Sequence, residues 1–162
     1  MTQDIELLNQ IHQNADMGRD SIRHIIQLSN DSQFLHALNS QLDEYEEAYD
    51  ESGRLLRAQG VQAEDASPVA KAMSRVTSTM KSLVNPSTSK LAEMMIQGNI
   101  MGVTELKKQL NAYHGSNPAI VSLAKRQLNM EEKNIEEMKN TCRNYKGWPG
   151  KLFSLPLQSL PT

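Results

Sequence analysis

The sequence predicts an all-α protein that folds as a four-helix bundle. Apolar residues recur every three or four positions along four long segments, which is the spacing of one face of a helix. Aromatic residues make up only 4% of the chain, whereas helix formers such as Leu, Ala, Met, Gln, Glu and Lys are abundant. A chain of 162 residues is long enough for one domain with a sizeable core.

Turn residues divide the chain into helical segments. The stretch SNDS, from Ser29 to Ser32, ends the first helix and can cap the second. Ser67–Pro68 and Asn117–Pro118 each place a capping residue before a proline, which favours a helix start at both points. We therefore expect long helices over about 4–28, 32–59, 87–114 and 118–145, a short helix over about 67–84, and a non-helical tail over 146–162.

The expected connections favour two hairpins. The first two long helices form one hairpin and the last two form another, with the short helix in the connection between them. Two hairpins joined by a long connection make a bundle with one crossover. An up-and-down bundle is the alternative, because a short helix can also serve as a corner. The bundle domain spans residues 1–145, and residues 146–162 form the tail.

Charge and composition exclude several classes of protein. The net charge of −2 gives no nucleic-acid footprint. The longest uncharged, mostly apolar stretch, Met94 to Thr104, is too short to cross a bilayer. Asp4 and Glu6 near the start are unlike a signal peptide, and the single cysteine, Cys142, suits a reducing compartment as a buried thiol. We expect a cytoplasmic protein that neither binds nucleic acid nor inserts into membranes.

One carboxylate falls where the core should be. Glu131 lies on the apolar stripe of its helix, between Ala124 and Ile135. A buried carboxylate must be paired, hydrogen-bonded or protonated, because burial of a bare charge is costly. The simplest interpretation is a structural carboxylate whose neighbours supply hydrogen-bond donors. The candidate donors are Gln127, Gln41, Tyr45 and Arg19.

Other polar residues fall near the midpoints of the long helices. Midpoints lie at one level in a bundle of antiparallel neighbours, so a shared polar layer is expected. Gly98 and Gly102 form a small patch where a bulky neighbour can pack closely. The expected layer contains Asp16, Gln41, Glu44, Gln97 and Glu131, with Glu93 on a secondary face of its helix.

In these features the chain resembles proteins of the ferritin-like superfamily. The stretches ELLNQIHQNADMG, QLDEYEEAY and AEMMIQGNIMG are similar to the helices of small bacterial ferritin-like proteins. The resemblance covers about residues 4–145 and implies a bundle with one crossover. It also implies a di-iron site with one carboxylate from each of two helices and a Glu-x-x-His from each of the others.

The chain departs from that iron-binding pattern. No histidine follows a glutamate by three positions, and the nearest replacements are Glu44-x-x-Glu47 and Glu131-x-x-Asn134. Carboxylates alone can hold hard cations, but oxygen-activating iron sites usually include imidazole. The residues three before His12, His24, His36 and His114 are Asn9, Ser21, Gln33 and Asn111.

Two functions follow as expectations. The favoured one is a non-catalytic, ferritin-like bundle without a cofactor, which acts through assembly or protein binding in the manner of spore-coat-type proteins. Its partner would be a second copy of the chain or another protein. The alternative is an iron- or manganese-binding, di-iron-like redox protein. Its metal ligands would be Asp16, Glu44, Glu93 and Glu131. The tail, with the sole tryptophan Trp148, is expected to dock in a groove of its own bundle or of a dimer, with disorder as the alternative.

Overall fold

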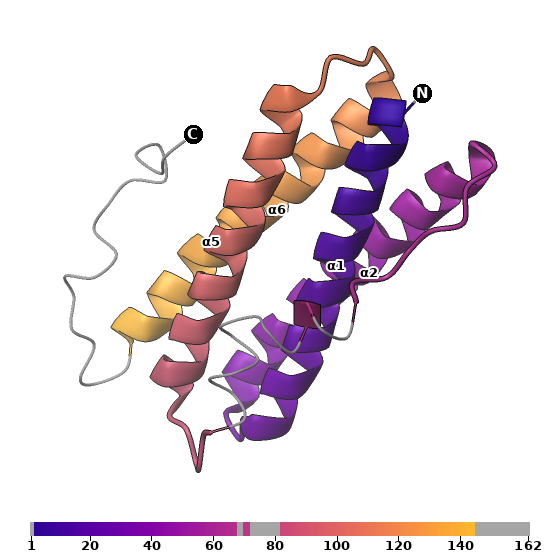
Figure 1. Cartoon of the computed structure of the whole chain (residues 1–162). Helices are drawn as coiled ribbons and strands as arrows, with labels where there is room; N and C mark the ends of the chain where they lie inside the picture. The colour runs from indigo at the N-terminus through magenta and orange to yellow at the C-terminus, as the bar shows by residue number, and fades with distance from the viewer. Residues whose placement is uncertain (1, 68–69, 72–81, 145–162) are drawn as a thin grey trace.

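The computed structural model describes residues 2–67, 70–71 and 82–144. Over these residues it contains four long helices and no strand, which confirms the predicted fold class (Figure 1). The short helix expected over 67–84 falls mostly outside the described residues, and the tail over 146–162 falls entirely outside them. The helices are α1 (Thr2–Leu28), α2 (Ser32–Ala58), α5 (Thr88–Ala112) and α6 (Pro118–Arg143).

Side-chain caps begin three of the helices. Asp31 precedes α2 and accepts a hydrogen bond from the backbone N–H of Phe34 at 2.8 Å. Ser87 does the same for α5, and Asn117 caps α6 ahead of its proline. Each cap satisfies a backbone donor that the first turn leaves without a partner. The turn signals therefore placed these starts within one residue of the observed ones.

Contacts between the helices fix their directions. In each neighbouring pair, a residue early in one helix meets a residue late in the other, so the two helices are antiparallel. For α1 and α2 the contacts are His12–Ser52 and Arg19–Glu46; for α2 and α6 they are Gln41–Glu137 and Arg126–Glu51; for α5 and α6 they are Cys142–Ser89 and Lys107–Glu132.

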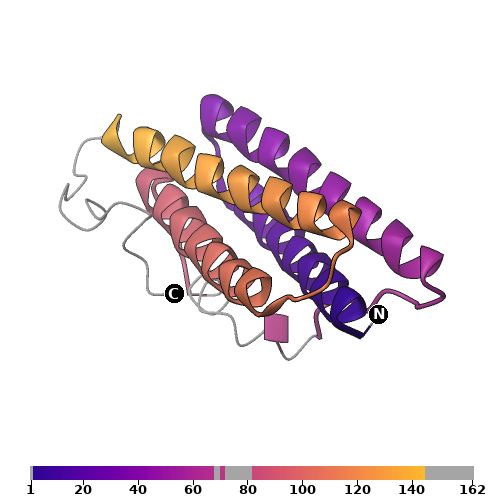
Figure 2. The same cartoon turned by 90° about the horizontal axis from the view of Figure 1, so that it is seen from above.

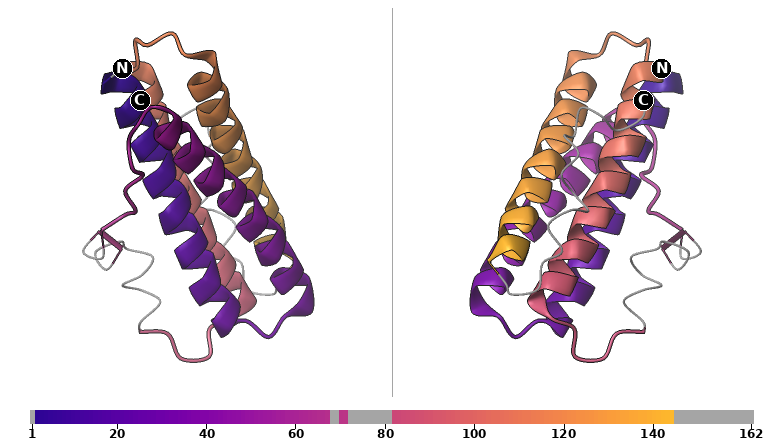
Figure 3. Two further views of the ribbon diagram at one scale, coloured as in Figure 1. Left: turned by 90° about the vertical axis from the view of Figure 1, so that its right-hand side faces the viewer. Right: turned by 90° about the vertical axis from the view of Figure 1, so that its left-hand side faces the viewer.

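It follows that α2 and α5 run in the same direction. The chain must therefore travel the length of the bundle between them, which confirms the single crossover and excludes the up-and-down alternative. Figure 2 shows the α1–α2 hairpin beside the α5–α6 hairpin, with α6 next to α2 and α5 next to α1. In Figure 3 the α1–α2 loop and the start of α5 lie at one end, and the α5–α6 loop lies at the other.

The apolar core is divided into two clusters by polar residues of α6. One cluster contains Leu8, Ile11, Leu56 and Ile120, and the other contains larger residues such as Phe34. Along α6, Gln127, Glu131 and Asn134 lie between Ala124 of the first cluster and Ile135 of the second. All three are buried. Among the described helices, none has an apolar stretch long enough to span a bilayer.

Candidate binding site at the centre of the bundle

Glu131 lies at the centre of the bundle and is fully buried, with 0% exposure. Its Oε1 accepts hydrogen bonds from Asn14 Nδ2 at 2.7 Å and from Gln127 Nε2 at 3.4 Å. Its Oε2 has no hydrogen-bond partner among the described residues. Burial raises the pKa of Glu131 from 4.5 to about 8, although Gln127, Asn14 and Tyr45 act in the opposite direction. At neutral pH this side chain is therefore mostly a neutral carboxylic acid.

Two glycines make room for this site. A Cβ placed on Gly102 of α5 would overlap the Glu131 carboxylate, and a Cβ on Gly18 of α1 would overlap the ring of Tyr45. Any larger residue at either position would have to displace a buried side chain. The expected close approach at Gly98 and Gly102 is thus observed at Gly102, where the bulky neighbour is Glu131.

Tyr45 and Asn99 form a buried hydrogen bond across the bundle. The Tyr45 hydroxyl donates to Asn99 Oδ1 at 2.7 Å, and Asn99 Nδ2 donates to the backbone carbonyl of Met95 at 2.9 Å. Burial, and then the nearby Glu131, raise the pKa of Tyr45 well above its ordinary value. The Tyr45 hydroxyl therefore lies between Asn99 and Glu131.

Several other buried polar atoms near this level have no partner among the described residues. They belong to α2 and α6 and, with Glu131, make up what we call the interior polar layer. Most of them are oxygens, so the layer has a surplus of hydrogen-bond acceptors. The atoms are Gln41 Oε1, Glu44 Oε2, Gln127 Oε1, Glu131 Oε2, and both Oδ1 and Nδ2 of Asn134.

The four predicted metal ligands do not share a centre. Asp16 pairs with Arg19 at 3.0 Å and with Lys71 at 2.7 Å. Glu44 pairs with Lys133 at 3.1 Å, and Glu93 pairs with Lys90 at 3.5 Å. Of the four, only Glu131 lacks a cationic partner in the described part of the chain. Within the described ranges, no three His, Cys, Asp or Glu side chains are grouped so that they could hold a metal ion.

The donor set around Glu131 does not fit a di-iron centre. His24, His36 and His114 are exposed, and His114 lies beyond the end of α5 rather than in its last turn as expected. His12 is buried, but both of its ring nitrogens already have partners on α2 and on the loop that follows it. None of the four histidines is therefore available to the interior polar layer, which leaves it without the imidazole ligands that oxygen-activating iron sites usually include.

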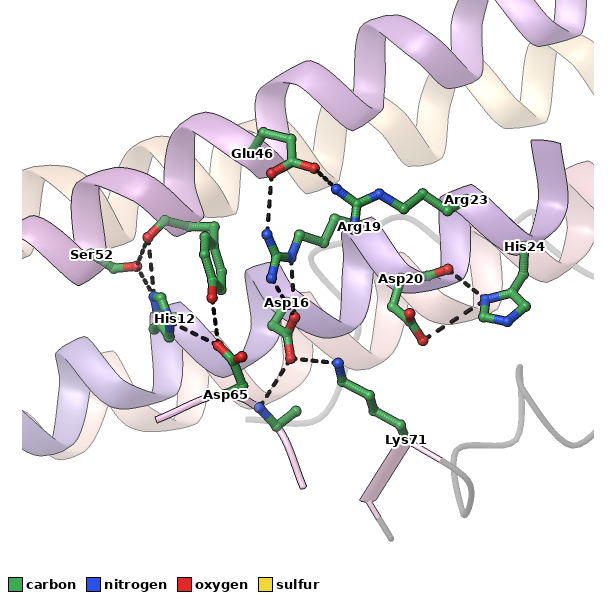
Figure 4. Close-up of polar contacts among 12 residues, drawn as sticks. His12, Asp16, Arg19, Asp20, Arg23, His24, Glu46, Ser52, Asp65 and Lys71 are labelled. Atoms are coloured by element: carbon green, nitrogen blue, oxygen red, sulfur yellow. Dashed lines mark hydrogen bonds and ion pairs between the residues drawn. The ribbon is translucent and has the colours of Figure 1, made fainter. Parts of the chain in front are cut away.

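His12, Ser52 and Asp65 resemble a nucleophile triad but cannot act as one. His12 Nδ1 lies 2.9 Å from Ser52 Oγ, and His12 Nε2 lies 3.2 Å from Asp65 Oδ1 (Figure 4). Ser52 has 0% exposure, and its hydroxyl donates to the Tyr49 carbonyl at 2.9 Å. A nucleophile must reach its substrate, so this arrangement is structural.

The same network fastens the start of the crossover to α1 and α2. Asp65 accepts a hydrogen bond from the Tyr49 hydroxyl at 2.6 Å, which lowers the pKa of Asp65 and raises that of Tyr49. The Tyr49 ring stacks on His12, and the Arg19 guanidinium lies 3.4 Å from its centroid. The backbone N–H of Ala66 donates to Asp16 Oδ2 at 3.1 Å. Asp16 is therefore an anchor for this loop.

A groove of about 700 Å³ lies between α1, α5, the loop residues 64–67 and Ala70. We call it the α1–α5 groove. Its described lining includes Asn14 and Gly102, which contact Glu131, and the hydrogen-bonded pair Tyr45 and Asn99. Four methionines also line it: Met17, Met94, Met95 and Met101. Its charged lining, over the described residues, is wholly acidic and consists of Glu64, Asp65 and Glu105.

Comparisons with protein-family models, with curated proteins and with solved structures found no match to this chain. The kinship with ferritin-like proteins therefore stays a prediction. The evidence for a four-helix bundle with one crossover is the set of helix contacts described above. The function of the site is inferred from its geometry.

Proposed function

We propose that this chain is a non-catalytic, ferritin-like helical bundle that acts by binding another protein in the α1–α5 groove. The observation that carries the proposal is the groove itself, with its methionine walls and acidic edge. Its volume of about 700 Å³ suits a few large side chains of a partner.

The exposed Met101 supports a binding role, beside the core packing of Met94 and Met95. Met101 is 47% exposed, although an apolar side chain of this size is usually covered. Methionine has a flexible and polarisable side chain, so a surface rich in it can adapt to the shape of a partner. Met94 and Met95 are buried beside it and connect the groove to the core.

A catalytic role has less support, because the groups that could perform chemistry are already engaged. Ser52 is buried and donates to a carbonyl, and Asp16 is held by two cations and a backbone N–H. Glu131 is a neutral acid behind Gly102 at neutral pH. None of these groups is free to act on a substrate where it stands.

A photo-crosslinking side chain at position 101 tests the proposal. We expect illumination of living cells to yield one discrete adduct with a second protein, which the purified partner then reproduces. Asp43 on α2 is exposed and does not line the groove, so the same group at position 43 is the matched control. Adducts of equal yield from positions 101 and 43 would contradict the proposal. An adduct with a second copy of this chain would make the function self-assembly.

A second candidate function is binding of a hard cation in the interior polar layer. The observation that favours it is the set of partnerless buried oxygens, above all Oε2 of Glu131. Carboxylate and amide oxygens are the donors that Mn²⁺, Mg²⁺ and Ca²⁺ prefer. If the layer binds such a cation, Mn²⁺ or Ca²⁺ should raise the melting temperature of the metal-free protein, and Glu131→Gln should abolish the rise.

A further inference from the structure

We propose that residues 145–162 of the same chain dock in the α1–α5 groove and compete there with the partner. This regulatory role rests on the proposed function, whereas the docking itself does not. Residues 145–162 lie outside the described part of the structure, so only their sequence bears on the groove.

The charges of the two surfaces are complementary. Residues 145–162 contain Lys146 and Lys151 and no Asp or Glu. The charged lining of the groove, over its described residues, is the acidic set Glu64, Asp65 and Glu105. Opposite charges at the edge of an interface favour one occupant over others and fix its register.

The apolar residues of this segment also match the groove. A segment with many large apolar side chains and few charges gains free energy when a groove removes it from water. The methionine walls can adapt to aromatic and leucine side chains. The large apolar residues of the segment are Trp148, Leu152, Phe153, Leu155, Leu157 and Leu160.

The segment starts close to one end of the groove. Near the end of α6, Cys142 Sγ donates to the carbonyl of Ser89, which lies in the first turn of α5. The groove follows α5 from Met94 to Glu105, a rise of about 17 Å. Eighteen residues can span about 60 Å when extended. The segment is therefore long enough to pass α5 and to lie along the groove.

Trp148 allows the docking to be measured in the full chain, because it is the only tryptophan. We expect its fluorescence to be blue-shifted, and to be quenched by acrylamide several-fold less than that of a synthetic peptide of residues 145–162. Glu105→Lys, at a half-buried edge position of the groove, should raise quenching toward the peptide value. Asp43→Lys makes the same charge change on an exposed site of α2 and should leave quenching unchanged.

A charge exchange separates a specific effect from damage to the fold. Lys146→Glu with Lys151→Glu should release Trp148 on its own, and the combination with Glu105→Lys should restore protection. Circular dichroism confirms that each variant keeps its helices. Quenching of wild-type Trp148 equal to that of the free peptide would overturn the inference. If Glu105→Lys leaves the protection of Trp148 unchanged, the segment docks elsewhere and the inference is overturned. If the protection depends on protein concentration, the segment docks on a second copy and the inference is overturned as well.

The inference and the proposed function fail separately. If Trp148 is unprotected while position 101 still crosslinks to a partner, the partner binds an unoccupied groove. The inference is then wrong and the proposed function is not. If Trp148 is protected by the groove while position 101 yields no partner adduct, the groove binds only residues 145–162 and the proposed function is wrong. If both hold, the charge-reversed segment should increase the yield of partner adduct.

Discussion

Replacement of Glu131 by glutamine should stabilise the bundle at neutral pH and remove part of its pH dependence. Glu131 has a pKa of about 8 in the folded state and an ordinary value of 4.5 when exposed. Between these two values the folded state holds a proton that the unfolded state has lost. The free energy of unfolding therefore falls by about 1.4 kcal/mol for each pH unit over this range.

The sign follows from the direction of the pKa change. The stability that Glu131 contributes is fully present below about pH 4.5 and is lost as the pH rises toward 8. From pH 5.5 to 7.5 the loss amounts to about 3 kcal/mol. Glutamine does not titrate, and its carbonyl oxygen can still accept the hydrogen bond from Asn14. At pH 7.5 we expect the variant to be more stable than the wild type by up to about 4 kcal/mol.

Urea unfolding followed by circular dichroism at several pH values measures this effect. Other carboxylates also titrate, so the informative quantity is the difference in free energy of unfolding between variant and wild type at each pH. That difference should grow steadily from pH 5.5 to 7.5. Glu47→Gln, at an exposed site of α2, should give a difference that does not change with pH. A parallel pH dependence of wild type and Glu131→Gln would refute the reasoning.

Three further predictions follow from the contacts. Gly102→Ala should lower the free energy of unfolding by about 1–3 kcal/mol, because the new methyl overlaps Glu131; in a Glu131→Ala background the loss should largely vanish. Asp65→Ala should lower the pKa of Tyr49, which an alkaline absorbance titration detects, and an unchanged titration would contradict the hydrogen bond between them. Cys142, whose pKa burial raises, should react with a thiol reagent much more slowly in the native protein than in denaturant, and equal rates would contradict its burial.

The helices could be predicted from sequence because their signals are local. The apolar spacing and the caps at Ser87 and Asn117 depend on residues a few positions apart, and the observed ends agree with the expected ones to within two residues. The single crossover was one of two alternatives. Only contacts between distant residues, such as Arg126 with Glu51, decided between them.

The burial of Glu131 was also predictable, since its own helix places it on the apolar stripe. Gln127 was correctly expected as a donor, because it lies one turn away on the same face. Asn14 was missed, as its contact depends on how α1 lies across the bundle from α6. Arg19 was expected to reach Glu131 and instead pairs with Asp16 and Glu46.

The polar layer was predicted only in part. Gln41 and Glu131 are buried and Glu44 is half-buried, but Gln97 is exposed on the outer face of α5. Asp16 is buried and faces the loop that contains Ala66. That loop is about fifty residues away along the chain, so no local pattern could show the contact.

Elemental analysis of the untagged protein, purified without chelator from cells supplied with iron and manganese, is the most decisive single measurement. We interpret Glu131 as a neutral, structural carboxylic acid in a bundle that works by binding through its groove. This interpretation predicts far less than one metal ion per chain, in the wild type and in Glu131→Gln alike. One or more bound ions per chain in the wild type, lost in Glu131→Gln, would contradict it and make the interior polar layer a metal site.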